Sequence, residues 1–173
     1  MSASSLLSSS VRATTADESR FRLDYPLAPA RAVRVVALGP AAESMVRRVA
    51  DLPWDTARFL VVEDTRPADD AGSASNADTA DFGLRKLDGS ATSLGLELVD
   101  VDVTIMVAST DSAAAAAATI GAACGVRAIM TAGIVIGNDW TQTTVTVLRP
   151  FARVLMVSAD EDDLIALLTA VRA

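Results

Sequence analysis

Short apolar runs alternate with helical and polar segments along most of the chain. Runs rich in β-branched and other apolar residues occupy positions 33–38, 58–62, 103–108, 127–136 and 153–157. Each run has the length and composition of a buried strand. Residues 41–52, 113–125 and 164–171 carry helical spacing or strong helix formers, and Gly125 is expected to end the second of these helices. The alternation predicts parallel strands joined by crossover helices.

Three further segments are less regular. Residues 82–87 indicate a short edge strand, and residues 90–98 a short helix or a turn. Residues 139–149 include threonines and valines that favour a strand, but a crossover is needed before the run at 153–157, so we expect a helix. The expected fold is therefore α/β and Rossmann-like, with three layers: a mostly parallel sheet of five or six strands and helices on both faces.

Composition suggests how the chain is divided. Residues 1–19 are rich in Ser, Ala and Thr without periodicity, so we expect them to be disordered. Residues 20–173 are expected to form a single domain, because 173 residues suffice for one full core. Residues 65–80 hold many acidic and small residues and are expected to form a mobile acidic loop.

Charge and residue usage exclude several classes of function. The net charge of -7 argues against a nucleic-acid partner, and the absence of histidine excludes Ser-His-Asp and Cys-His catalysis. No apolar run approaches the ~20 residues of a membrane span, and no signal peptide is evident, so we expect a cytoplasmic protein without membrane contact. Cys124, the lone cysteine, excludes an internal disulfide and is expected to be a small buried helix residue.

The turn after the first predicted strand occupies the position of a dinucleotide-binding loop. Gly39 matches the first glycine of such a loop, whereas Ala41 and Ser44 stand where the other two would be. A Cβ at the second position obstructs the approach of a pyrophosphate. Glu63 or Asp64, at the end of the second strand, stands where a ribose-binding acid would be, although an acid at a strand end is common.

The turn after the third strand of the parallel set offers a second candidate. Ser109, Thr110, Asp111 and Ser112 could present hydroxyls and helix N-terminal amides to an anion. Asp111 is itself an anion, as is Glu43 in the first helix, so both turns are expected to be occupied by the protein's own carboxylates. The acidic group at 160–163 could chelate a hard cation such as Mg²⁺, but an acidic first helical turn is the more ordinary interpretation.

The order of these elements resembles the nucleotide-binding domain of the FtsZ/tubulin family. Residues 33–48 are similar to its opening strand, loop and helix, residues 59–65 to its second strand, and residues 102–115 to its strand and phosphate loop. Residues 148–164 resemble a later helix, strand and acidic turn. Both phosphate loops lack the family's glycines here, and the chain stops before the family's second domain, which supplies catalytic acids. The resemblance therefore implies a shortened relative that has lost GTP hydrolysis.

These observations lead to two functional hypotheses. The first is a non-catalytic α/β protein, derived from a nucleotide-binding fold, that acts through association with a protein partner or with itself and holds no cofactor or metal. The alternative is a nucleotide- or small-ligand-binding enzyme that uses the turn at 109–112 with Glu63 or Asp64. Trp54 and Trp140 stand at element ends, where bulky apolar side chains can anchor an interface, so we expect a homodimer.

Overall fold

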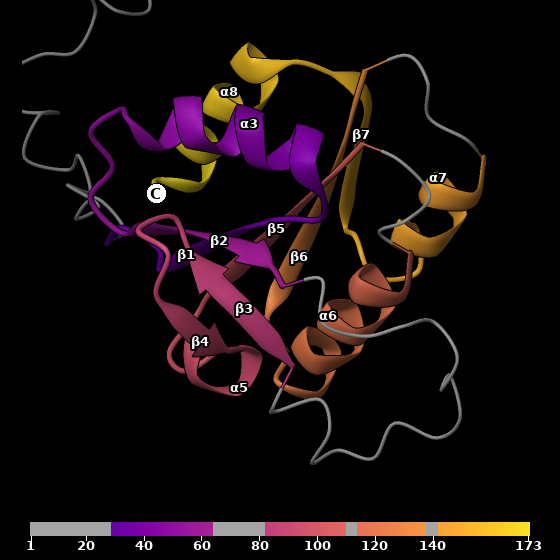
Figure 1. Ribbon diagram of the computed structural model, residues 1–173, viewed down its shortest axis with the longest axis horizontal. Coiled ribbons are helices and arrows are strands. Elements are labelled where there is room, and N and C mark those ends of the chain that lie inside the picture. Colours follow the sequence, from indigo (N-terminus) through magenta and orange to yellow (C-terminus); the bar gives the residue numbers. More distant parts are fainter. Residues whose placement is uncertain (1–28, 64–81, 110–113, 138–141) are drawn as a thin grey trace, which may run out of the picture.

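The chain folds around one mixed, mostly parallel sheet (Figure 1). The computed structural model describes residues 29–63, 82–109, 114–137 and 142–173. Among them the sheet has seven strands in the order β4-β3-β2-β1-β5-β6-β7. The strands are β1 Val33–Ala37, β2 Ala57–Val62, β3 Gly83–Lys86, β4 Ala91–Ser93, β5 Val103–Ala108, β6 Met130–Ile136 and β7 Val154–Ala159.

The five strands from β2 to β7 in this order are parallel, and the β3–β4 hairpin extends the sheet in antiparallel pairing. In the centre, β1 pairs on one side with β2 and on the other with β5, so that Val35 has Phe59 and Ile105 as its neighbours. A register shift interrupts the pairing of β6 with β7 between Val135 and Ile136.

Helices cover both faces of the sheet. Helices α3 (Pro40–Ala50) and α8 (Glu161–Val171) pack on one face, and α5 (Leu94–Glu97), α6 (Ala114–Val126) and α7 (Gln142–Leu148) on the other (Figure 1). Two buried apolar clusters follow from this layering. Val35 of β1 points into the cluster beneath α3 and α8, whereas its neighbour Val36 points into the cluster beneath α6.

The predicted α/β class with a mostly parallel sheet and helices on both faces is confirmed. The predicted strand number was too low, because residues 90–98 form β4 followed by α5 rather than only a helix or a turn. Residues 142–148 form the expected helix. Residues 127–129 precede β6 instead of belonging to it, and the acidic residues from Glu161 onward already belong to α8.

Two local predictions need correction. Helix α6 continues through Gly125 to Val126, and the residue with a left-handed backbone after it is Ala128, at φ 55. Trp54 is half-buried against the core, and its indole N–H donates to the Val49 carbonyl at 2.8 Å, so it is not an exposed anchor. Cys124 is buried in α6 as expected, and this burial raises the pKa of its thiol.

Some sequence-based predictions concern other parts of the chain. The N-terminal segment 1–19, the acidic loop 65–80 and Trp140 lie outside the described residues. Within the described residues, no helix is long and apolar enough to cross a membrane.

Candidate functional site

The carboxyl ends of β1 and β5 form the topological switch point of the sheet. The chain leaves β1 toward α3 on one face and leaves β5 toward α6 on the opposite face. The Leu38 N–H donates to the Val107 carbonyl at 2.8 Å, which holds the two strand ends together. Open α/β sheets bind ligands at this position, because the diverging connections leave a crevice between them. Gly39 and Ser109 follow the two strands and therefore lie at this switch point.

Gly39 is needed for the turn between β1 and α3. Its backbone has φ 138 and ψ 170, a conformation that is readily accessible only to glycine. No side chain caps α3 at this residue, and Pro40, the first residue of the helix, has no N–H to donate. The first amides of α3 without an acceptor in the helix are therefore those of Ala41 and Ala42, and Ala42 is buried.

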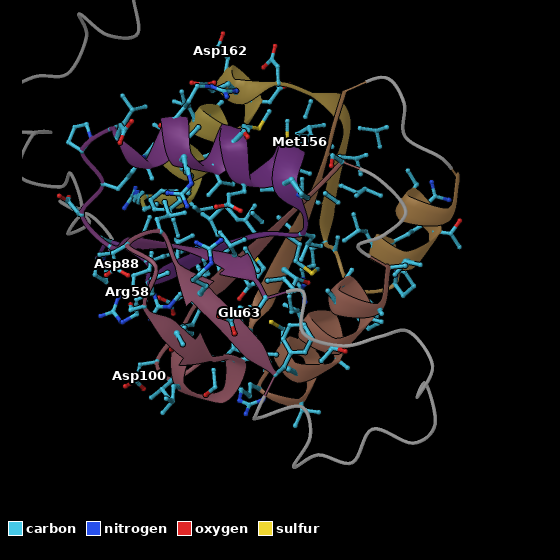
Figure 2. All side chains as sticks on the ribbon, viewed as in Figure 1. Arg58, Glu63, Asp88, Asp100, Met156 and Asp162 are labelled. Atoms are coloured by element: carbon cyan, nitrogen blue, oxygen red, sulfur yellow. The ribbon has the colours of Figure 1, made fainter. Side chains whose placement is uncertain are left out.

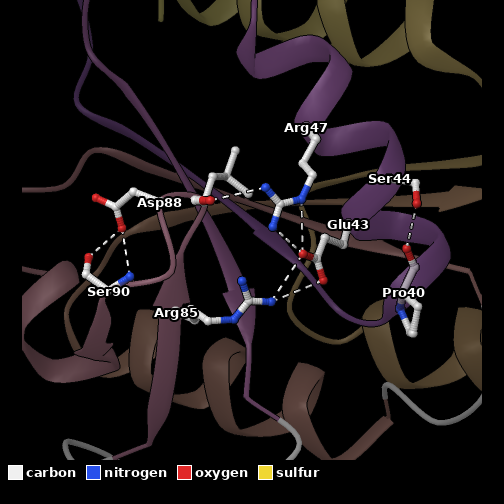
Figure 3. A network of polar contacts seen from close by, with 8 residues as sticks. Pro40, Glu43, Ser44, Arg47, Arg85, Asp88 and Ser90 are labelled. Carbon is white, nitrogen blue, oxygen red and sulfur yellow. Dashed lines mark hydrogen bonds and ion pairs between the residues drawn. The ribbon is translucent and has the colours of Figure 1, made fainter.

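The hydroxyl of Ser44 is hydrogen-bonded within its own helix. Its side chain is exposed on α3, and its hydroxyl donates to the Pro40 carbonyl at 3.1 Å (Figure 3). A serine that bonds the carbonyl four residues earlier satisfies its hydroxyl locally. Ser44 thus matches the third position of a dinucleotide loop in sequence, without presenting a free hydroxyl there.

Glu43 is the centre of an ion-pair network beside this turn (Figure 3). Its Oε1 lies 2.6 Å from Arg47 Nη2 and 3.1 Å from Arg85 Nη2. Arg47 also donates to the Leu87 carbonyl at 3.1 Å. The hydrogen bond from Arg47 lowers the pKa of the Glu43 carboxyl, partial burial opposes the shift, and Arg85 lowers it further. Glu43 lies in the first turn of α3, as expected, but two arginines neutralise its charge and connect α3 to β3.

Glu63 lies one strand away from Gly39, at the end of β2. Its backbone N–H donates to the Gly83 carbonyl at 3.3 Å, and its side chain is close to the Gly83 backbone (Figure 2). A Cβ at Gly83 would lie 3.3 Å from Glu63 Oε2, so the glycine leaves room for this carboxylate. Ser109 at the end of β5 is buried. Asp64, Thr110, Asp111 and Ser112 lie outside the described residues.

A cavity of about 430 Å³ lies at the opposite end of β2, and sequence reasoning missed it. Its wall combines the first residues of β2 with the end of β3 and with Glu97 of α5. Arg58 and Asp88 lie on this side of the molecule (Figure 2). The lining residues are Ala57, Arg58, Phe59, Leu60, Lys86, Leu87, Asp88 and Glu97.

Behind this wall, Arg34 and Glu97 form a buried ion pair. Arg34 Nε lies 3.3 Å from Glu97 Oε2 and donates to the Glu97 backbone carbonyl at 2.9 Å. Thr92 donates to Glu97 Oε1 at 3.0 Å, and Arg58 Nη1 lies 3.9 Å from Oε2. Burial lowers the pKa of Arg34, as does the neighbouring Arg58, and Glu97 opposes both effects.

This pair ties α5 and the β3–β4 hairpin to the central strand, which is a structural role. An arginine within the otherwise apolar run at 33–38 was the sequence signal that could have indicated it, because a charge buried in a strand requires a partner. The partner itself is 63 residues away and follows no local pattern.

The acidic turn at 160–163 caps a helix. Asp160 Oδ1 accepts from the Asp163 N–H, and Asp163 Oδ2 accepts from the Asp160 N–H, each at 3.1 Å. These two bonds form a capping box at the start of α8. In the described part of the chain, no group of three or more acidic or cysteine residues could hold a metal ion.

Comparisons with known proteins identify no family. No protein-family model matches the chain, and no curated protein is similar to it. Two solved structures of proximal thread matrix protein 1 from the mussel byssus are weakly similar in backbone. One, in crystal form 2, has 12% identity and a TM-score of 0.38, and the other, with a zinc-occupied MIDAS motif, has 14% identity and a TM-score of 0.37. Each match covers 80% of this chain and 43% of the other, so the matched part spans less than half the length of those proteins.

Proposed function

We propose that this chain is a non-catalytic α/β protein, derived from an FtsZ/tubulin-like nucleotide-binding fold, that acts through protein association. The observation that carries the proposal is the difference between the two edges of the sheet. At one edge, β4 is only three residues long. At the other, β7 is a six-residue strand without a charged residue, and its Val154 and Val157 side chains are 47% and 37% exposed.

A long, uncharged edge strand is a template for pairing with another chain. Its outward N–H and C=O groups have no partner strand in the described part of the molecule. Native proteins usually protect such edges with charges, prolines or a short strand, and β7 has none of these; the register shift against β6 lies at its end, so that Val154 to Val157 remain regularly paired. Association through this edge would give its backbone groups partners and cover the two valines.

The switch point supports the non-catalytic part of the proposal. The N-terminus of α3 begins with a proline, which has no N–H to donate, and the Ser44 hydroxyl is bonded within the helix. A phosphate-binding turn presents free amides and hydroxyls instead. The described part of the switch point is therefore a poor phosphate site.

Sedimentation of the full chain over a wide concentration range tests the association. We expect the weight-average mass to rise with concentration toward that of a complex. A mass of one chain up to about 200 µM would contradict the proposal, because a small specific interface typically gives micromolar affinity.

The second candidate function is binding of a nucleotide or small ligand at the switch point. The position of Gly39 and the buried Ser109 beside the diverging connections of β1 and β5 favours it. A thermal-shift screen with GTP, ATP, NAD and FAD in the presence of Mg²⁺ separates the two candidates. A ligand at 100 times its dissociation constant stabilises the folded state by about 2.7 kcal/mol, whereas the non-catalytic proposal expects no shift.

A further inference from the structure

The charges at the two ends of β7 have opposite signs. Arg153, immediately before the strand, is exposed. Asp160 directly follows the strand and is exposed, and Glu161, Asp162 and Asp163 come next in α8. The uncharged strand is thus bounded by a basic residue at its start and an acidic turn at its end, as the positions of Met156 and Asp162 in Figure 2 illustrate for the strand and the turn.

This asymmetry determines which self-pairing is favourable. In a parallel arrangement of two β7 strands, the acidic turns of both copies would lie side by side, about 5 Å apart across the strands. In an antiparallel arrangement, Arg153 of each copy lies near the acidic turn of the other. The two acidic turns are then separated by the length of the strand, about 20 Å for six residues. That distance exceeds the Debye length of about 8 Å at physiological salt, so their repulsion is largely screened.

A second copy of this chain therefore has the charge pattern that this edge requires. A chain of net charge -7 repels its copies in most orientations, and the antiparallel contact at β7 brings opposite charges together instead. Such a contact is isologous, because each copy uses the same surface, and it closes as a dimer. A two-fold axis perpendicular to the sheet also keeps the helical layers in line, so that α8 of both copies lies on the same side.

We infer that two copies of this chain form a homodimer by antiparallel pairing of β7 with β7, so that both sheets join into one. The inference rests on the proposed association and specifies its partner and its surface. The two-fold axis passes through the middle of the strand, near Met156 and Val157. Trp54, one of the two anchors expected from the sequence, has no part in this interface because its indole packs against the core of its own domain.

Surface lysines provide the first test. In the full chain, Val154→Lys and Val157→Lys place a charge on the exposed edge without entering the core. Leu96→Lys is the matched control, because Leu96 is 71% exposed on α5, away from β7. In sedimentation equilibrium we expect each β7 variant to weaken the dimer about tenfold or more and the control to leave it unchanged. An unchanged dimer in both β7 variants overturns the inference.

Cysteine cross-linking tests the antiparallel geometry directly. Met156→Cys and Val157→Cys place a thiol near the proposed axis, whereas the native Cys124 is fully buried. Under mild oxidation we expect a disulfide-linked dimer from at least one of these variants and none from Leu96→Cys. A dimer in sedimentation that cross-links through Leu96→Cys and through neither β7 position overturns the β7 interface but leaves the association intact. A chain that stays monomeric throughout overturns both.

Discussion

Arg34 on β1 and Glu97 at the end of α5 form a salt bridge in the interior, with 3.3 Å between Arg34 Nε and Glu97 Oε2. Their side chains are only 8% and 5% exposed. Removing both charges from water is costly, and their mutual attraction together with the bonds to the Glu97 carbonyl and from Thr92 offsets that cost. The pair therefore adds little net stability compared with apolar residues, but breaking it leaves an unpaired buried charge.

We therefore predict that Glu97→Ala destabilises the fold strongly. The variant leaves the Arg34 guanidinium buried without its carboxylate, which typically costs about 3–5 kcal/mol in the free energy of unfolding. The matched control is Glu161→Ala, which breaks the ion pair with Arg48 that is much more exposed than the Arg34–Glu97 pair, and it should cost about 1 kcal/mol or less. Urea denaturation of both variants provides the comparison.

The double variant Arg34→Met/Glu97→Leu checks the physical reason. It removes both charges and keeps apolar volume at the site, so it should recover most of the stability lost in Glu97→Ala. If Glu97→Ala were no more destabilising than Glu161→Ala, the buried pair would not be needed for the stability of the fold.

Replacing each of two glycines of α6 with alanine should change the stability of the fold in opposite directions. A Cβ on Gly121 would lie 2.3 Å from Phe151 Cγ, so the aromatic ring would have to move, at a cost of about 1–3 kcal/mol. A Cβ on Gly125 would meet no atom within 4 Å, and alanine there should stabilise the helix by about 0.5–1 kcal/mol. Thermal unfolding of the two variants should therefore shift the Tm downward for Gly121→Ala and upward for Gly125→Ala. Equal shifts would contradict the close packing of α6 against Phe151.

The capping box of α8 yields a third prediction. Asp160→Ala removes the acceptor for the Asp163 N–H and should reduce the free energy of unfolding by about 1 kcal/mol. Asp162→Ala, in the same acidic turn, removes a carboxylate that has no part in the box and should have a smaller effect. If the two variants were equally destabilised in urea, the general charge of the turn would matter more than the cap.

Much of the fold could be predicted because the central strands are apolar on both faces. Val33, Ile105 and Ile134 belong to such runs, and a continuous apolar run indicates a strand covered by helices on both sides. Strand β4 could not be predicted, because its three residues are held by pairing with β3, as where Thr92 faces Leu84. The end of α6 was misplaced because Ala128 adopts the left-handed conformation that usually favours glycine.

The candidate site was predictable only where it depends on local sequence. Gly39 follows from the strand, turn and helix pattern around it. The partners of the charged residues do not, because Glu43 pairs with Arg85 42 residues away and Arg34 with Glu97 63 residues away. Such contacts are decided by the order of the strands in the sheet, which the hydrophobic pattern leaves open.

The Glu43 network should make stability depend on pH. The hydrogen bond from Arg47, with a further contribution from Arg85, holds the folded-state pKa of Glu43 below its usual value. The resulting stabilisation is fully present above the unfolded-state pKa of about 4.3 and is lost as pH falls through the lower folded-state pKa.

Glu43→Gln should therefore be less stable than wild type near neutral pH, by about 1 kcal/mol or less because the arginines are partly exposed. The difference should shrink below about pH 4, as urea titrations across pH would show, and in an Arg85→Gln background it should be smaller near neutral pH. A difference that stays constant down to pH values well below this range would mean that the arginines do not stabilise the ionised carboxylate.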